Sequence, residues 1–166
     1  MTPTRSAVPS ASAADNVNAA ALLPWMRYLL WFVGGYNILA GIGMMVFYHE
    51  GFRFLNVPKP ELMLPLQIVG VMVALYGVGY WLTAWNPIEN RNVLTLGFFS
   101  KLLGSMLGVS YIVLGELPLL FLPILFFADI VYLAPFLVIM RRLYRLARES
   151  RATASGQGLG ASSRAA

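Results

Sequence analysis

Four long runs of apolar residues, separated by short polar stretches, dominate the chain. The runs cover approximately residues 27–48, 63–84, 93–114 and 119–140. Each is long enough for a helix to cross the hydrocarbon core of a bilayer, which takes about 20 residues. Residues 49–62, with two prolines and balanced charge, predict a loop, and residues 86–92 and 116–118 predict tight turns. The pattern therefore predicts an all-α, antiparallel bundle of four transmembrane helices.

The two ends of the chain have a different composition from the four runs. Residues 1–21 are rich in Ala, Ser and Thr, and residues 149–166 end in a stretch rich in Gly, Ala and Ser. Neither end has an apolar face that could be buried, so we expect both to be disordered tails. The transmembrane domain is expected to cover residues 22–148.

Composition supports the membrane class and excludes several others. Hydrophobic residues make up 58% of the 166 residues and charged residues 11%, whereas soluble proteins average about 25% charged residues. The absence of cysteine excludes disulfides and thiolate metal sites. The chain also lacks a phosphate-binding loop, a dinucleotide-binding fingerprint and an HExxH motif.

The positive charge is distributed unevenly, although the net charge is only +5. With four spans, both termini lie on one side of the membrane, and most of the cationic residues fall on that side: Arg5, Arg27, Arg91, Arg141, Arg142, Arg145, Arg148, Arg151 and Arg164. Only Arg53 and Lys59 fall on the other side. Cytoplasmic loops are enriched in Lys and Arg, which predicts cytoplasmic termini. The arginines after residue 140 adjoin a span, which favours anionic lipid over nucleic acid as their partner.

Small residues recur at helical spacing in the first three runs, and they predict close helix contacts. They comprise Gly34, Gly35, Gly41 and Gly43 in the first run, Gly70, Ala74 and Gly77 in the second, and Ser100, Gly104 and Gly108 in the third. The four tryptophans, Trp25, Trp31, Trp81 and Trp85, are expected near the cytoplasmic interface.

Lys101 and Asp129 are charged residues within otherwise apolar runs. A lone charge at that depth costs at least about 2.5 kcal/mol, so we expect the two to pair. Counted at 1.5 Å per residue from the cytoplasmic ends, Asn37, Tyr76, Lys101 and Asp129 all lie roughly 12–16 Å deep. These four residues, one from each helix, are the candidate ligand-binding site.

Several functions are compatible with such a central polar layer. The Lys–Asp pair alone would lock two helices together, whereas a binding site would hold the head group of a lipid-like or quinone-like molecule or contact a partner membrane subunit. A non-enzymatic binding protein is the leading interpretation. The alternative is a small intramembrane enzyme or redox-accessory subunit with Lys101 or Asp129 as acid or base. A proton or ion path is the third reading, and no cofactor can be named.

A second group of polar residues is expected at the opposite face of the membrane, close to the ends of three helices: His49, Glu50, Gln67 and Glu116. One histidine with two carboxylates has the donor types of a metal site. A single histidine at a helix end is more often an interfacial residue, and no metal is predicted.

Two blocks of the sequence resemble a known kind of membrane protein. The first runs from Gly97 through Lys101 to Gly104, and the second reads D-I-V-Y-L-A-P-F from Asp129 to Phe136. Together with the segment Tyr76–Tyr80, they resemble a family of small bacterial inner-membrane proteins of unassigned function that are similar in layout to the DoxX-like proteins. Ser100 stands where that family has a glycine, and Tyr132 where it has a tryptophan. The resemblance covers residues 63–140 and implies a four-helix protein of the bacterial inner membrane, but no reaction.

Overall fold

The computed structural model describes the backbone of residues 20–163 and the side chains of residues 20–152. The elements follow one another in the order α2 (Pro24–Val46), α3 (Tyr48–Leu55), α4 (Leu64–Trp85), α5 (Arg91–Val113), α6 (Phe121–Leu125), a π-helical turn η1 (Phe126–Ile130) and α7 (Val131–Ser163). The residues described form no strand. The predicted all-α bundle is confirmed, and the four expected spans coincide with α2, α4, α5 and the continuous segment from α6 into α7.

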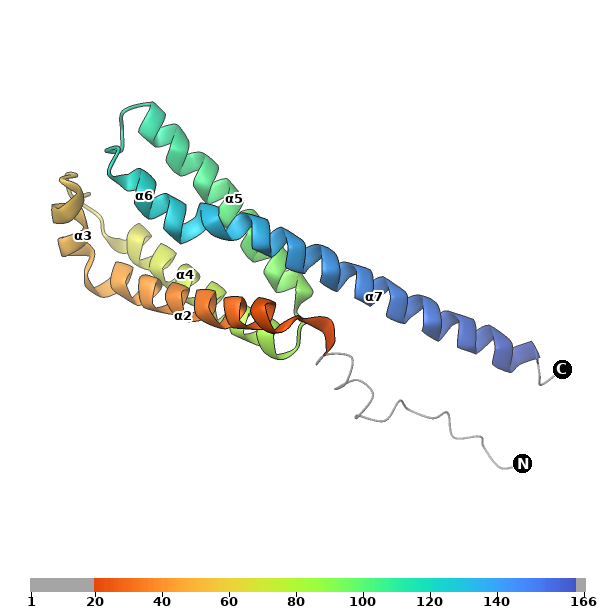
Figure 1. Ribbon diagram of the computed structural model, residues 1–166. Helices are drawn as coiled ribbons and strands as arrows, with labels where there is room; N and C mark the ends of the chain where they lie inside the picture. Colours follow the sequence, from red (N-terminus) through yellow and green to blue (C-terminus); the bar gives the residue numbers. More distant parts are fainter. Residues whose placement is uncertain (1–19, 164–166) are drawn as a thin grey trace.

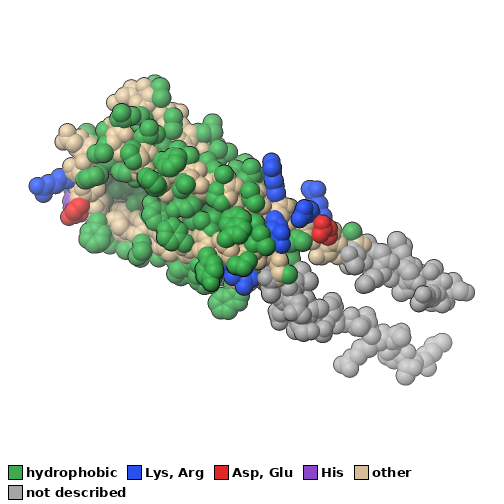
Figure 2. Space-filling view, in the orientation of Figure 1, with side chains coloured by type: hydrophobic (Ala, Val, Ile, Leu, Met, Phe, Trp, Pro, Cys, Tyr) green, Lys and Arg blue, Asp and Glu red, His purple; other side chains and the backbone are tan. Residues whose placement is uncertain are grey.

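Four helical segments are long and apolar enough to cross a membrane: Pro24–Val46, Leu64–Trp85, Arg91–Val113 and Phe121–Ala152. Their large apolar side chains face outward, as Leu39 and Val113 do with exposed fractions of 72% and 79%. In Figure 2 apolar side chains cover the body, and the visible charged side chains lie toward its two ends. So large an apolar surface is compatible with lipid and not with water. The chain is an integral, multi-pass membrane protein.

Helices α2 and α4 lie side by side along most of their length (Figure 1). Their contact is made by two pairs of glycines, Gly34 with Gly77 and Gly41 with Gly70. A Cβ atom added to Gly77 would lie 2.5 Å from the Gly34 carbonyl oxygen, and one added to Gly70 would lie 2.8 Å from that of Gly41. The backbones therefore touch directly, as the small residues in these two helices predicted.

The small-residue ridge of α5 was predicted to make a similar contact, and this prediction holds only at Gly108, where an added Cβ would lie 2.9 Å from a Leu125 side-chain carbon. Ser100 and Gly104 are exposed, and a Cβ added to Gly104 would meet nothing within 4 Å. Helix α5 instead turns the face with Gly97, Lys101 and Ser105 inward. Burial of the Lys101 charge against its partner explains this rotation, because leaving the charge in lipid costs more than leaving a glycine there.

The segment expected to be a loop contains the short helix α3. The helix ends at Leu55, and the residue after it, Asn56, adopts a left-handed conformation (φ 52°). Glu50 lies in its first turn and Arg53 in its last, which suits the helix dipole. Its apolar side chains Phe52 and Leu55 are partly buried. The prolines that suggested a loop lie beyond the end of the helix.

The chain ends also differ from expectation within the part that the structure describes. Ala21, assigned to the tail, is buried in the core at 1% exposure. Arg142 on α7 donates a hydrogen bond to the Ala21 carbonyl at 2.9 Å. Helix α7 continues to Ser163, whereas disorder was expected from residue 149, and Figure 1 shows it extending well past the bundle. The expected tails at residues 1–19 and 164–166 lie outside the described residues.

Candidate functional site

Lys101 and Asp129 form a direct ion pair inside the bundle, as predicted. The Lys101 ammonium lies 2.7 Å from Asp129 Oδ1 and donates a second hydrogen bond to the Ala128 carbonyl at 2.8 Å. It also lies 5.5 Å from the centre of the Tyr132 ring, within reach of a cation–π interaction. The two side chains are covered unequally, since 7% of the lysine side chain is exposed and 27% of the aspartate side chain.

The Asp129 end of this pair lies in the π-helical turn η1. Within it, the Val131 N–H bonds to the Phe126 carbonyl, five residues earlier instead of four. Such turns widen a helix by one residue and are frequent at functional sites. Pro123 and Pro135 flank the turn and cannot donate backbone hydrogen bonds. The Lys101 ammonium supplies a donor to one carbonyl of this turn, so the pair stabilises the helix as well as the two charges.

Three tyrosines that were not predicted as site residues lie in one row of aromatic rings, and the row reaches the ion pair at Tyr132. Asp129 interacts electrostatically with Tyr36 of α2, Tyr80 of α4 and Tyr132 of α7. The Tyr36 and Tyr132 rings are 6.4 Å apart, and Phe136 lies 6.3 Å from Tyr132 and 5.0 Å from Tyr80. Helices α2, α4 and α7 thus present a continuous aromatic wall to the ion pair. The signal available in the sequence was the three-residue spacing between Asp129 and Tyr132, which puts them on one helix face.

The other two members of the predicted polar layer, Asn37 and Tyr76, have other surroundings on α2 and α4. Asn37 is buried at 4% exposure, on the α2 face that carries Gly34 and Gly41. Its Nδ2 has no hydrogen-bond partner among the described residues. Tyr76 is half-buried and stacks on Tyr80 with 6.5 Å between ring centres. Neither is hydrogen-bonded to Lys101 or Asp129 within the described range.

Ser105 is a further buried polar residue that the sequence analysis did not select. It lies one turn along α5 from Lys101, is 5% exposed, and its hydroxyl has no partner in the described part of the chain. Buried polar groups are normally hydrogen-bonded, so unsatisfied donors such as Asn37 and Ser105 call for an explanation.

Within the described residues, no side-chain hydrogen bond or salt bridge joins the four residues expected at the opposite face. His49 and Glu50 are exposed on α3, Gln67 is half-buried in α4, and Glu116 is exposed after α5. His49 is instead 3.4 Å from Lys59 Nζ. Across residues 20–152, no group of three or more His, Asp or Glu side chains is placed to hold a metal ion.

Comparisons with models of protein families, with curated proteins and with solved structures give no match.

Proposed function

We propose that this protein is a non-enzymatic, ligand-binding protein of the bacterial inner membrane. In this proposal the polar layer around Asp129 holds the head group of a quinone-like or lipid-like molecule. The resemblance to small DoxX-like membrane proteins belongs to the same proposal. A partner membrane subunit that contacts the polar layer is the alternative to a small ligand.

The exposure of Asp129 carries this proposal. Lys101 binds only Oδ1, and 27% of the side chain stays uncovered inside an apolar span. An acceptor left open in a low-dielectric environment is costly, so a pair that served only to lock two helices would be expected to enclose it. A hydroxyl group of a reduced quinone or a lipid could donate to the second carboxylate oxygen. The nearby tyrosine hydroxyls could donate to a carbonyl oxygen of the same head group.

The geometry favours binding over catalysis by Lys101. Its ammonium donates to both Asp129 and Ala128, and the residue is only 6% exposed. A lysine that acts as a base needs a deprotonated amine facing its substrate. Both hydrogen bonds direct the ammonium toward the protein and away from a ligand.

A quinone is expected to stabilise the protein through the Tyr36 hydroxyl. In phosphatidylcholine nanodiscs, decylubiquinone at about 100 times its Kd should add about 2.7 kcal/mol to the unfolding free energy. Tyr36→Phe keeps the ring but removes one hydrogen bond, which should weaken binding about threefold to tenfold. Both effects are measured by recording the melting temperature at increasing concentrations of decylubiquinone.

Tyr28→Phe is the matched control, because Tyr28 lies on the same helix and is 75% exposed. It should bind the quinone as the parent protein does. Equal affinity in both variants, or no stabilisation by the quinone at all, would contradict a head-group site at this layer.

The same proposal places both chain ends in the cytoplasm, because the arginines gather at the end of the bundle where α7 extends. The chain contains no cysteine, so single cysteines report sidedness without background. In intact cells a membrane-impermeant maleimide should label Lys59→Cys and not Arg148→Cys. The reverse labelling pattern would show that the topology is opposite to the one proposed.

A further inference from the structure

The end of the bundle that carries α3 contains an apolar cavity of about 500 Å³. Its wall is formed by Ala40 and Met44 of α2, Phe52 and Leu55 of α3, Leu66 of α4 and Phe121 of α6. The volume falls within the range of small-molecule sites, about 300–1,000 Å³. The cavity therefore lies between the α2–α4 pair and the start of the fourth span, with α3 across its end.

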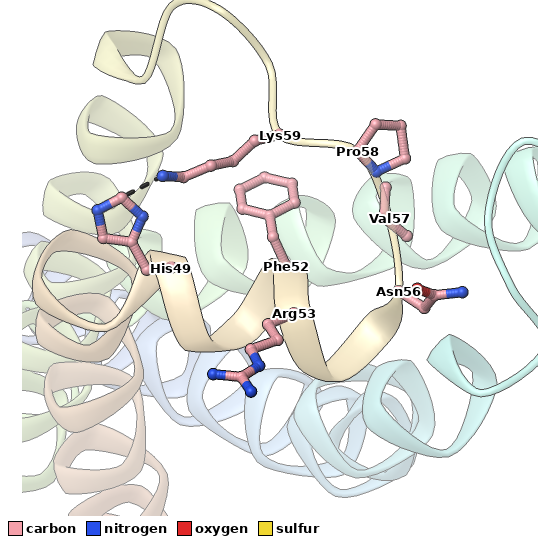
Figure 3. Close-up of a pocket in the computed structure, with 7 residues that line it drawn as sticks. All are labelled: His49, Phe52, Arg53, Asn56, Val57, Pro58 and Lys59. Carbon is pink, nitrogen blue, oxygen red and sulfur yellow. Dashed lines mark hydrogen bonds between the residues drawn. The ribbon is translucent and has the colours of Figure 1, made fainter.

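A cationic hollow of about 400 Å³ lies on the adjacent face of α3. His49, Arg53 and Lys59 line it, and Figure 3 shows Lys59 reaching back over α3 to His49, 3.4 Å away. Lys59 also lies 5.3 Å from the centre of the Tyr48 ring. Glu50 and Glu61 are close in sequence, but neither lines the hollow. The hollow thus carries two permanent positive charges and no carboxylate.

The hollow and the cavity share two wall residues, Phe52 and Val57. At these two residues the apolar space adjoins the cationic one. A ligand that fills both spaces needs an anionic head and an apolar chain.

The volume of the apolar cavity indicates the size of the chain. A methylene group is about the size of a water molecule, whose share of liquid volume is about 30 Å³. A cavity of about 500 Å³ consequently matches one alkyl chain of fatty-acid length.

We propose that a long-chain fatty acid binds at α3, with its carboxylate in the cationic hollow and its alkyl chain in the apolar cavity. Each buried methylene contributes about 0.8 kcal/mol. The carboxylate adds charge-assisted hydrogen bonds from Lys59 or Arg53, which are stronger than neutral ones. This site is separate from the polar layer at Asp129 and does not depend on it.

Palmitate and methyl palmitate are the probes, added to the protein in phosphatidylcholine nanodiscs. Palmitate should bind at least about tenfold more tightly, because only it has an anionic head. The double variant Arg53→Gln, Lys59→Gln should reduce palmitate affinity to that of the ester and leave ester binding unchanged.

Gly43→Leu tests the position of the chain. Gly43 lines the cavity, and a Cβ added there meets nothing within 4 Å, so the new side chain fills the cavity without a clash. It should lower palmitate affinity at least about tenfold. Gly104→Leu is the matched control, because that glycine is equally open but lies on the outer face of α5. It should bind palmitate normally.

Three results would overturn the proposal. They are equal affinity for acid and ester, unchanged palmitate binding in Gly43→Leu, and displacement of palmitate by an equal concentration of phosphatidylglycerol, which has two chains. Tyr36→Phe should keep full palmitate affinity. If Tyr36→Phe lowered palmitate affinity while Gly43→Leu bound palmitate normally, the fatty acid would be bound at the central layer. That result would also contradict the site at α3.

Discussion

Replacing Lys101 with methionine is expected to destabilise the protein by about 3–5 kcal/mol, the cost of breaking a buried ion pair by removing one partner. The change leaves Asp129 charged inside a span and takes a donor from the Ala128 carbonyl in η1. Asp129→Leu should have a similar effect, because it leaves the Lys101 ammonium without its carboxylate. Equilibrium unfolding in mixed detergent micelles measures both losses.

The double variant Lys101→Met, Asp129→Leu should recover much of the loss, because no charge then remains buried. Lys59→Met is the control, since that lysine is exposed outside the spans and its loss should change stability by less than about 0.5 kcal/mol. Additive damage in the double variant would contradict the pairing. A stable double variant that no longer binds the quinone would show that the pair also serves the ligand, and one that still binds it would show a purely structural role.

Adding a single methyl group between α2 and α4 is expected to cost about 1–3 kcal/mol, the usual penalty for overpacking. Gly77→Ala would bring Cβ within 2.5 Å of the Gly34 carbonyl oxygen and 2.7 Å of an Ile38 side-chain carbon. Gly70→Ala would bring it within 2.8 Å of the Gly41 carbonyl oxygen. Backbone atoms cannot rotate out of the way, so the helices must separate. The melting temperature in detergent gives the measurement.

Gly43→Ala and Gly104→Ala are the controls, because an added Cβ at either position meets open space. Both should be neutral or stabilise their helices by up to about 1 kcal/mol, since alanine is the better helix former. If Gly77→Ala were as stable as these controls, the close contact between α2 and α4 would be disproved.

The sequence was informative about position along each helix and much less so about rotation around it. Apolar run length located the four spans, and depth counting matched Lys101 with Asp129. On α5, however, the exposed residues Ser100 and Gly104 and the buried residues Lys101 and Ser105 both follow a four-residue spacing. The two faces differ only by one residue, which is about 100° of rotation around the helix. Periodicity alone cannot choose between them. The need to bury the lysine charge could have done so.

The tyrosines were missed for the same reason. Asn37 and Tyr76 were chosen by depth, but Tyr36 and Tyr80 are the residues whose rings join Tyr132 and Phe136. Asn37 and Tyr36 are adjacent in sequence and differ only in their direction around α2. Helix α3 was missed because the prolines after it dominate the composition of residues 49–62. A helix of eight residues has little intrinsic stability, so its formation depends on the packing of Phe52 and Leu55, which a local pattern does not reveal.

The separation of Lys101 from Asp129 along the chain has a consequence for biosynthesis. The aspartate is 28 positions later, and ribosomes add about 5–20 residues per second, so it emerges about one to six seconds after the lysine. During that interval α5 contains an uncompensated positive charge that opposes its release into lipid. Helices α2 and α4 have no charged residue at mid-span and can enter the bilayer as soon as each is complete. We therefore expect the second half of the chain to leave the translocon as a joined hairpin of α5 with the α6–α7 segment, after the first half is already in the membrane.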